Sequence, residues 1–135
     1  AAASSRFGVP INRLGLTLAY EELRHLLGAV GRRAALEILL EGNLFDAPRA
    51  FGLGLLNRVV PDDELEAEAA ATAQRICSGA PLVNRWHKAF IRRLEDPRPL
   101  TAAEIDEGYA AFGTRDYRAG TRAFLEKRKP RFEGR

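Results

Sequence analysis

Glycine and proline residues divide this chain into short segments, and most of those segments have the periodicity of a helix. Apolar residues recur at three- and four-residue steps from Leu18 to Val30, and this spacing predicts a helix that Gly31 interrupts. Further apolar helices are expected over residues 34–40, from Asp62 to Gly79 and from Pro81 to Leu94. The chain is therefore predicted to be mostly helical.

Shorter elements lie between and after these helices. Asp46 can cap a short helix that ends at Gly52, and residues 55–60 (Leu-Leu-Asn-Arg-Val-Val) are the best strand candidate. The capping box Thr-Ala-Ala-Glu at residues 101–104 starts a helix that is expected to end at Gly113. A last helix is expected over about residues 116–128. The apolar faces of these last two helices are narrow, so they need a partner surface.

Composition places the chain among ordinary proteins with a buried core and outside the membrane-spanning class. The sequence is 46% hydrophobic and 29% charged, and no apolar run approaches the ~20 residues that cross a bilayer. The first six residues lack the pattern of a secretory signal, and the single Cys77 can form no intrachain disulfide. We therefore expect a cytoplasmic protein without a membrane partner.

Basic residues are concentrated at the end of the chain, although the net charge is only +3. The simplest interpretation is a solvated helix face and tail. The alternative is a site for a polyanion such as the phosphates of coenzyme A. Nucleic acid is the least favoured partner, because no nucleic-acid-binding fold motif is present. The basic residues of this region are Arg118, Arg122, Lys127, Arg128, Lys129, Arg131 and Arg135.

Several short motifs follow one another in an order that resembles the crotonase (enoyl-CoA hydratase/isomerase) superfamily. Each motif is weak alone, but the ordered set covers essentially the whole chain. The motifs are Phe-Gly-Val-Pro at residues 7–10, Leu14-Gly15, Val30-Gly31, Asp46-Ala47, Gly-Leu-Leu-Asn-Arg-Val-Val-Pro at residues 54–61, Ala-Pro-Leu at residues 80–82, Lys88, and residues 123–132.

The resemblance implies an α/β fold, the crotonase-like ββα spiral, with this chain as the C-terminal half of the subunit. Residues 1–61 would then be the end of the spiral core, and residues 62–135 a C-terminal helical region that forms contacts between subunits. A homotrimer or a dimer of trimers is expected, which would cover the narrow apolar faces. The upstream half, with the backbone amides of the oxyanion hole, would lie outside this sequence.

The resemblance also implies chemistry on an acyl-CoA thioester, with coenzyme A as part of the substrate and no separate cofactor. Two backbone N–H groups polarise the thioester carbonyl and stabilise an enolate, while carboxylates move protons. In the hydratases of this family, a catalytic Glu directly follows the Pro of Phe-Gly-x-Pro. Ile11 stands there in this chain, and its hydrocarbon side chain cannot carry a proton. We therefore expect Ile11 to line the substrate pocket.

Glu21 and Glu22 are the candidate catalytic residues that remain in this chain. Some isomerase-like family members place a carboxylate near this helix start, and the helix dipole there favours its ionised form. Glu21, or failing that Glu22, would then shuttle the proton while Tyr20 lines the pocket. The alternative is that both are ordinary first-turn acids that stabilise the helix end.

Phe112, Phe124 and Lys127 are the candidate ligand-binding residues near the end of the chain, because family members use aromatic and lysine groups there for adenine and phosphates. Packing in a core is the alternative for Phe124. His25 and His87 have no Cys, Asp or Glu at metal-ligand spacing, so we expect no metal site.

Taken together, the sequence predicts an enzyme of the enoyl-CoA hydratase/isomerase family, a lyase or isomerase of fatty acid metabolism. Because of Ile11, an isomerase-like or divergent reaction is favoured over ordinary hydration. The alternative is a homologue that binds acyl-CoA but has lost catalysis.

Overall fold

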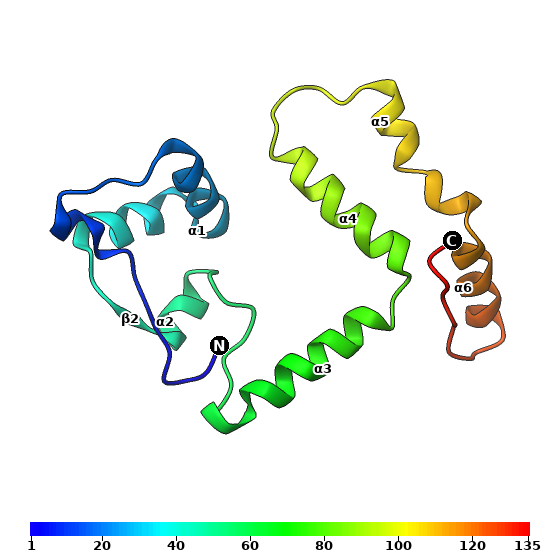
Figure 1. Cartoon of the computed structure of the whole chain (residues 1–135), viewed down its shortest axis with the longest axis horizontal. Helices are drawn as coiled ribbons and strands as arrows, with labels where there is room; N and C mark the ends of the chain where they lie inside the picture. The colour runs from blue at the N-terminus through cyan, green and yellow to red at the C-terminus, as the bar shows by residue number, and fades with distance from the viewer. The chain divides into compact units, whose positions relative to one another are not determined.

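The computed structural model describes all residues 1–135 and contains six α-helices, three 3-10 helices and one two-stranded sheet (Figure 1). The chain forms two compact units, Ala1–Ala69 and Ala70–Arg135. The expected boundary at residue 61, between the end of the spiral core and the C-terminal helical region, stays a prediction. None of the helices combines the length and the hydrophobicity of a bilayer-spanning segment. The elements are β1 (Arg6–Phe7), η1 (Pro10–Leu14), α1 (Tyr20–Glu41), β2 (Phe45–Asp46), α2 (Ala47–Gly52), η2 (Asp62–Glu64), α3 (Leu65–Cys77), α4 (Pro81–Leu94), α5 (Ala102–Glu107), η3 (Ala110–Gly113) and α6 (Arg115–Leu125).

Helix α1 has a break at Gly31, as the sequence indicates. Gly31 has φ 72° and ψ 168°, a conformation outside the helical region that glycine adopts without steric cost. Helix α1 therefore consists of two helical stretches, one on each side of this residue. The first begins at Tyr20 and the second ends at Glu41. The short helix predicted after Asp46 is also confirmed, and the Asp46 carboxylate accepts the Arg49 N–H at 2.9 Å.

The predicted strand over residues 55–60 is wrong for all but its last residue. Val60 alone forms a parallel bridge, in which its N–H donates to Ala1 O (3.1 Å) and its carbonyl accepts the Ala3 N–H (2.8 Å). Residues 55–59 have no neighbouring strand, and strand propensity without a hydrogen-bonding partner does not produce a strand. The one sheet instead pairs β1 antiparallel with β2, placing Phe7 opposite Phe45.

The C-terminal helices are shorter than their sequence patterns predict. The helix that starts at the Thr101 capping box ends at Glu107, and η3 follows after a turn at Gly108. The last helix, α6, ends at Leu125. Helix α4 matches the predicted bounds from Pro81 to Leu94.

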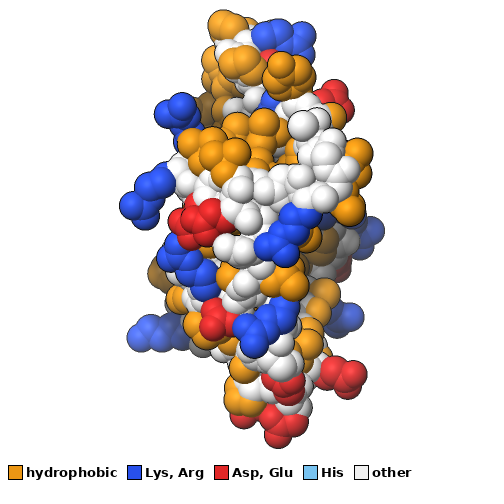
Figure 2. Space-filling model, turned by 90° about the vertical axis from the view of Figure 1, so that its left-hand side faces the viewer, with side chains coloured by type: hydrophobic (Ala, Val, Ile, Leu, Met, Phe, Trp, Pro, Cys, Tyr) orange, Lys and Arg blue, Asp and Glu red, His pale blue; other side chains and the backbone are white.

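Many large apolar side chains of the first unit are left uncovered, and all of its buried apolar side chains except Ile38 are alanines. Ala35, Ala47 and Ala50 are almost fully buried, whereas Leu40 is 73% exposed and Tyr20 is 90% exposed. Apolar side chains lie at the surface between basic ones on the face shown in Figure 2. A core made mostly of alanine buries little apolar area, and the exposed leucines present surface that another polypeptide can cover.

Asp116 fixes the end of the chain to helix α6. Its carboxylate, in a residue only 2% exposed, accepts the N–H of Glu133 at 2.7 Å and the N–H of Gly134 at 2.9 Å. Its own N–H donates to the carbonyl of Arg135 at 3.1 Å. Phe132 consequently lies against Gly120, where a side chain would leave less room.

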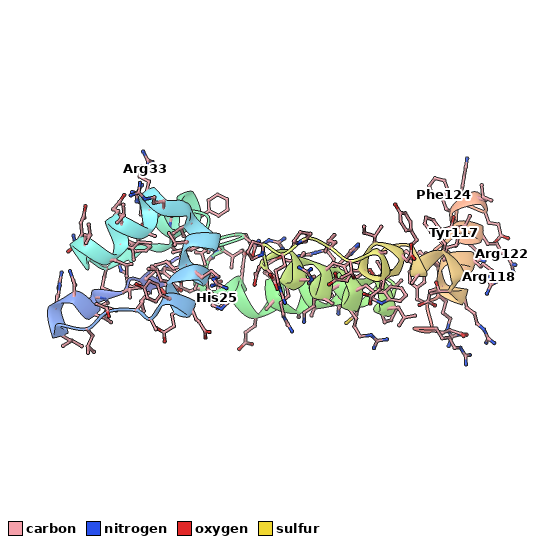
Figure 3. All side chains as sticks on the ribbon, turned by 90° about the horizontal axis from the view of Figure 1, so that it is seen from above. His25, Arg33, Tyr117, Arg118, Arg122 and Phe124 are labelled. Carbon is pink, nitrogen blue, oxygen red and sulfur yellow. The ribbon has the colours of Figure 1, made fainter.

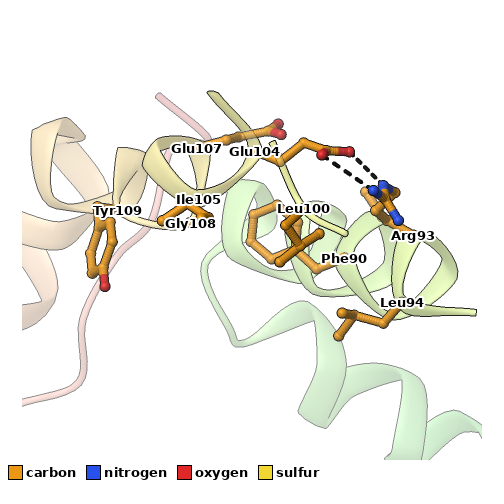
Figure 4. Close-up of a pocket in the computed structure, with 10 residues that line it drawn as sticks. Phe90, Arg93, Leu94, Leu100, Glu104, Ile105, Glu107, Gly108 and Tyr109 are labelled. Atoms are coloured by element: carbon orange, nitrogen blue, oxygen red, sulfur yellow. Dashed lines mark hydrogen bonds and ion pairs between the residues drawn. The ribbon is translucent and has the colours of Figure 1, made fainter. Parts of the chain in front are cut away.

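Arg93 and Glu104 tie helix α4 to helix α5 (Figure 4). The Arg93 guanidinium donates to both Glu104 oxygens and to the carbonyl of Pro99 at 3.1 Å. Glu104 also accepts the Thr101 N–H at 2.7 Å, which completes the predicted capping box. These bonds to the ionised carboxylate, those from Arg93 first, lower the pKa of Glu104 from its usual 4.5 to about 2.

We predict that Asp116→Ala frees the tail, because it removes two hydrogen bonds to a buried carboxylate. The loss is expected to destabilise the second unit by about 1–3 kcal/mol. Trypsin should then cleave between residues 127 and 131 faster than in the native protein. Asp106→Ala, which removes an exposed carboxylate from α5, is the matched control. Equal trypsin cleavage rates in the two variants would contradict this role of Asp116.

The lowered pKa of Glu104 predicts an acid-dependent loss of structure between α4 and α5. A carboxylate with a lowered folded-state pKa stabilises the fold above its unfolded pKa, and this stabilisation disappears as pH falls from about 4.5 to about 2. Glu104→Gln should remove this part of the pH dependence of thermal stability, measured by circular dichroism. Glu107→Gln serves as the control on the same helix. If Glu104→Gln left the pH dependence of thermal stability unchanged, the ion pair between Arg93 and Glu104 would not contribute to stability.

Candidate functional site

A pocket of about 560 Å³ lies in the first unit between η1 and helix α1. Ile11 and Tyr20, two of the residues predicted to line the substrate pocket, both contribute to it. Most of the other lining side chains are aliphatic, so the pocket suits an apolar group. Its lining consists of Ile11, Asn12, residues 16–20, Leu23, Leu39 and Leu40.

The side chain of Asn12 holds η1, and with it Ile11, against the end of α1. Asn12 Nδ2 donates to the carbonyl of Leu40 at 3.0 Å. A Cβ atom on Gly42 would lie 2.2 Å from Asn12 Oδ1, and Gly42 has the left-handed φ of 57°. Only glycine therefore fits where the helix ends beneath η1.

No carboxylate lines this pocket. The phenol of Tyr20 is the one ionisable side chain in its lining. Ile11 is partly buried, and the resemblance described above implies a Glu at this position in hydratases. The pocket can therefore bind an apolar chain. Its lining provides no carboxylate that could act as a general base.

The two acids at the start of α1 have different surroundings. The Glu22 carboxylate accepts the Ala19 N–H at 2.8 Å. This is half of a capping box, because Ala19 has no side-chain oxygen to accept a bond in return. Glu21 is exposed and makes no hydrogen bond or ion pair. The Glu22 carboxylate is thus hydrogen-bonded at the helix end, whereas the Glu21 carboxylate has no hydrogen-bonding or ion-pair partner.

Phe112, Phe124 and Lys127 all belong to the second unit. Phe112 meets Tyr117 edge to face, with ring centroids 5.1 Å apart. Phe124 is 82% exposed, so the alternative of a core position is excluded within this chain. Figure 3 shows Phe124 and Tyr117 on helix α6.

Lys127 has an unusual backbone conformation at the end of α6. Its φ is 53°, and it is the one non-glycine residue with positive φ. The Lys127 N–H donates to Phe124 O at 3.1 Å and the Arg128 N–H to Ala123 O at 3.0 Å, which together form a Schellman motif. Glycine usually occupies this position, and a side chain there costs roughly 1 kcal/mol. Such a residue is a candidate for a role of its side chain.

A second groove, of about 630 Å³, lies in the second unit between α4 and α5 (Figure 4). Phe90, Leu94, Leu100 and Ile105 form its apolar walls, and Arg93 and Glu104 lie at its edge. The sequence indicated the proline-containing linker and the capping box. It did not indicate this groove, because no motif links Arg93 to Glu104 before the helices are folded together.

The chain contains no group of three or more His, Cys, Asp or Glu side chains arranged to hold a metal ion. The expectation that no metal takes part stays a prediction.

Comparison with known proteins identifies the family of this chain. The enoyl-CoA hydratase/isomerase family model matches residues 1–135. The crystal structure of an enoyl-CoA hydratase/carnithine racemase from Magnetospirillum magneticum is 54% identical with a TM-score of 0.95, covering 99% of this chain and 50% of that one. A probable enoyl-CoA hydratase of Mycobacterium bovis is 34% identical, with 100% of this chain and 53% of the relative covered.

A methylmalonyl-CoA decarboxylase of Escherichia coli is 32% identical, with 99% of this chain and 53% of the relative covered. The chain thus spans about half the length of the curated relatives that it matches. The ordered motifs, the helical structure and these matches agree on one fold, the crotonase fold. The chain belongs to the enoyl-CoA hydratase/isomerase family.

Proposed function

We propose that the protein acts on an acyl-CoA thioester through a stabilised enolate, and that its reaction is isomerase-like or otherwise divergent from ordinary hydration. The observation that carries this proposal is Ile11 in a pocket without a lining carboxylate. Addition of water needs a group that activates the water molecule and one that returns a proton to carbon. A hydrocarbon side chain can do neither.

The family membership is compatible with such a divergence. One of the relatives above is named as a probable hydratase, one as a hydratase/carnithine racemase, and a third, 32% identical, as a methylmalonyl-CoA decarboxylase. Enolate stabilisation by an oxyanion hole is useful to all reactions that place negative charge on a thioester oxygen. The preceding half that such relatives have would supply the oxyanion hole in this proposal.

Glu21 is the proposed proton carrier, with Tyr20 at the wall of the pocket. Support comes from the free carboxylate of Glu21 in the first turn of α1, next to a residue that lines the pocket. Glu22 is the second choice, because its carboxylate already accepts the Ala19 N–H.

Phe112, Phe124 and Lys127 are proposed to bind the adenine and phosphates of coenzyme A. The exposed ring of Phe124 and the αL backbone of Lys127 support this assignment. Coenzyme A is part of the substrate, and the proposal requires no separate cofactor and no metal.

The proposal includes a homotrimer or dimer of trimers, located in the cytoplasm and active in fatty acid metabolism. The exposed apolar side chains of the C-terminal helices support an oligomer, since Ile91, Leu94 and Phe112 are all more than half exposed. The second candidate function is an acyl-CoA-binding protein without catalysis, which the absence of a carboxylate from the pocket also favours.

Replacing Ile11 by an acid is expected to increase hydration. In a chain extended by the N-terminal half found in relatives, Ile11→Glu should raise the crotonyl-CoA hydration rate at least ~10-fold, because it adds a proton carrier. Ile11→Gln, of similar size but without acid–base chemistry, is the control and should give no increase. Fast hydration by the native protein, unimproved by Ile11→Glu, would refute the proposal.

Glu21→Ala and Glu22→Ala should have separable effects. Loss of a proton carrier lowers kcat by ~10²–10⁴-fold, so Glu21→Ala should reduce 3-enoyl-CoA isomerisation by that amount. Glu22→Ala should instead destabilise the first unit by about 0.5–1.5 kcal/mol through the lost hydrogen bond. Turnover that neither change reduces would rule out both residues as the base.

The second candidate function, acyl-CoA binding without catalysis, predicts a different experimental result. It predicts tight binding of acyl-CoA with no exchange of the thioester's α-hydrogens in D2O. Measurable exchange favours the enzyme, because it requires an enolate and a proton carrier. The 135 residues by themselves are expected to show no turnover.

A further inference from the structure

The pocket between η1 and helix α1 has two walls that are far apart in the sequence. Ile11 and Asn12 of η1 belong to one wall, and Leu39 and Leu40 near the end of α1 belong to the other. The second stretch of α1 is anchored by the buried Ala35, whereas η1 contains no buried residue. The width of the pocket therefore depends on what holds η1 in place.

A side-chain hydrogen bond connects these two walls. Asn12 Nδ2 donates to the carbonyl of Leu40 at 3.0 Å, and both residues line the pocket. The carbonyl groups in the last turn of a helix have no N–H partner within that helix. Leu40 lies in the last turn of α1, so Asn12 satisfies a carbonyl that the helix itself leaves without a donor.

Gly42 gives the Asn12 amide its space. A Cβ atom at Gly42 would lie 2.2 Å from Asn12 Oδ1, and the φ of Gly42 is 57°, in the left-handed region that favours glycine. The amide of Asn12 therefore lies directly against the backbone of Gly42. The hydrogen bond to Leu40 thus depends on a donor in η1 and on a glycine after α1.

A second connection of η1 lies outside the pocket. The Arg13 guanidinium donates to Asn43 Oδ1 at 3.0 Å, and neither of these residues belongs to the pocket lining. Arg13 and Asn12 are neighbours in η1, so both bonds hold the same short element. Only the bond from Asn12 joins two lining residues. The Arg13 bond is therefore a matched comparison within the chain.

We propose that Asn12 is a positioning residue that determines how strongly the pocket discriminates between acyl chains of different length. This inference rests on the proposed function, in which the acyl group of the thioester enters this pocket. A hydrocarbon chain gains affinity from each CH2 group only where the wall stays in contact with it. A gap of about 0.5–1 Å already loses roughly a quarter to a half of the dispersion attraction. The bond from Asn12 to Leu40 keeps the two walls at a fixed separation.

The exposed position of Asn12 separates this role from a contribution to the core. Asn12 is exposed, so water can replace its donor at the carbonyl of Leu40 after a substitution. The variants are therefore expected to fold. Water does not connect the two walls, however, and the effect of a substitution should appear in acyl-chain binding. A purely structural role would leave the dependence on chain length unchanged.

The experiment measures the Kd of butyryl-, hexanoyl- and octanoyl-CoA by calorimetry, with free coenzyme A as reference. The protein is the chain extended by the preceding half of its relatives, and these saturated thioesters have no double bond to hydrate or isomerise. In the native protein each added CH2 should lower Kd roughly fourfold. In Asn12→Ala the factor should fall below about twofold per CH2, while the Kd of free coenzyme A stays the same.

Three further variants separate the hydrogen bond from side-chain volume and from general loosening of η1. Asn12→Asp keeps the size but has no donor for the carbonyl of Leu40, so it should behave like Asn12→Ala. Gly42→Ala should also reduce the factor, because its Cβ displaces the Asn12 amide. Combining Gly42→Ala with Asn12→Ala should cause no additional loss, since both act on one bond. Arg13→Ala should keep the native factor.

Two results would overturn the proposal directly. One is a native dependence on chain length in both Asn12→Ala and Asn12→Asp, with circular dichroism confirming that they are folded. The other is an equal loss in Arg13→Ala. A native Kd that does not change with chain length would also overturn it, because the acyl chain would then lie outside this pocket. Exchange of the thioester's α-hydrogens in D2O would in each case still support the enolate chemistry, so the proposed function fails or stands separately.

Discussion

The hydrogen bond from Asn12 to the carbonyl of Leu40 determines the arrangement of the candidate site. It joins a five-residue 3-10 helix to the last turn of a long helix, and the missing side chain of Gly42 gives it room. Because Ile11 is the neighbour of Asn12, this contact brings Ile11 to the pocket wall beside Leu39 and Leu40. The chemistry proposed for the protein follows from which side chain occupies that position.

The structure separates residues that stabilise the fold from residues that are free to act. Glu22, Glu104 and Asp116 each accept backbone N–H groups, and their carboxylates are therefore needed to hold a helix end or the tail. Glu21 has no such partner.

The sequence predicted those elements whose signals are local. The capping box at Thr101, the cap at Asp46, the interruption at Gly31 and the helix from Pro81 were all confirmed. The strand over residues 55–60 failed because a strand depends on neighbours, and here only Val60 has one. The ends of the last helices were also misplaced, since apolar periodicity continues through Tyr109 although the backbone changes at Gly108.

Of the candidate site, the sequence named two residues that line one pocket, and their role in binding substrate stays a prediction. Ile11 and Tyr20 were both assigned to the pocket, and the structure brings them together. The engagement of Glu22 depends on the backbone geometry at Ala19, and the Arg93–Glu104 groove depends on how two helices meet. Neither has a sequence signature.

The central claim is that a hydrocarbon side chain occupies the place of a proton carrier. A crystal structure of the chain extended by the preceding half of its relatives, with a bound unreactive enoyl-CoA analogue, tests it most directly. We predict that Ile11 lies in van der Waals contact with the acyl carbons next to the thioester, at roughly 4 Å. A structure in which Ile11 lies far from those carbons, with a carboxylate other than Glu21 or Glu22 placed against them, would contradict the account.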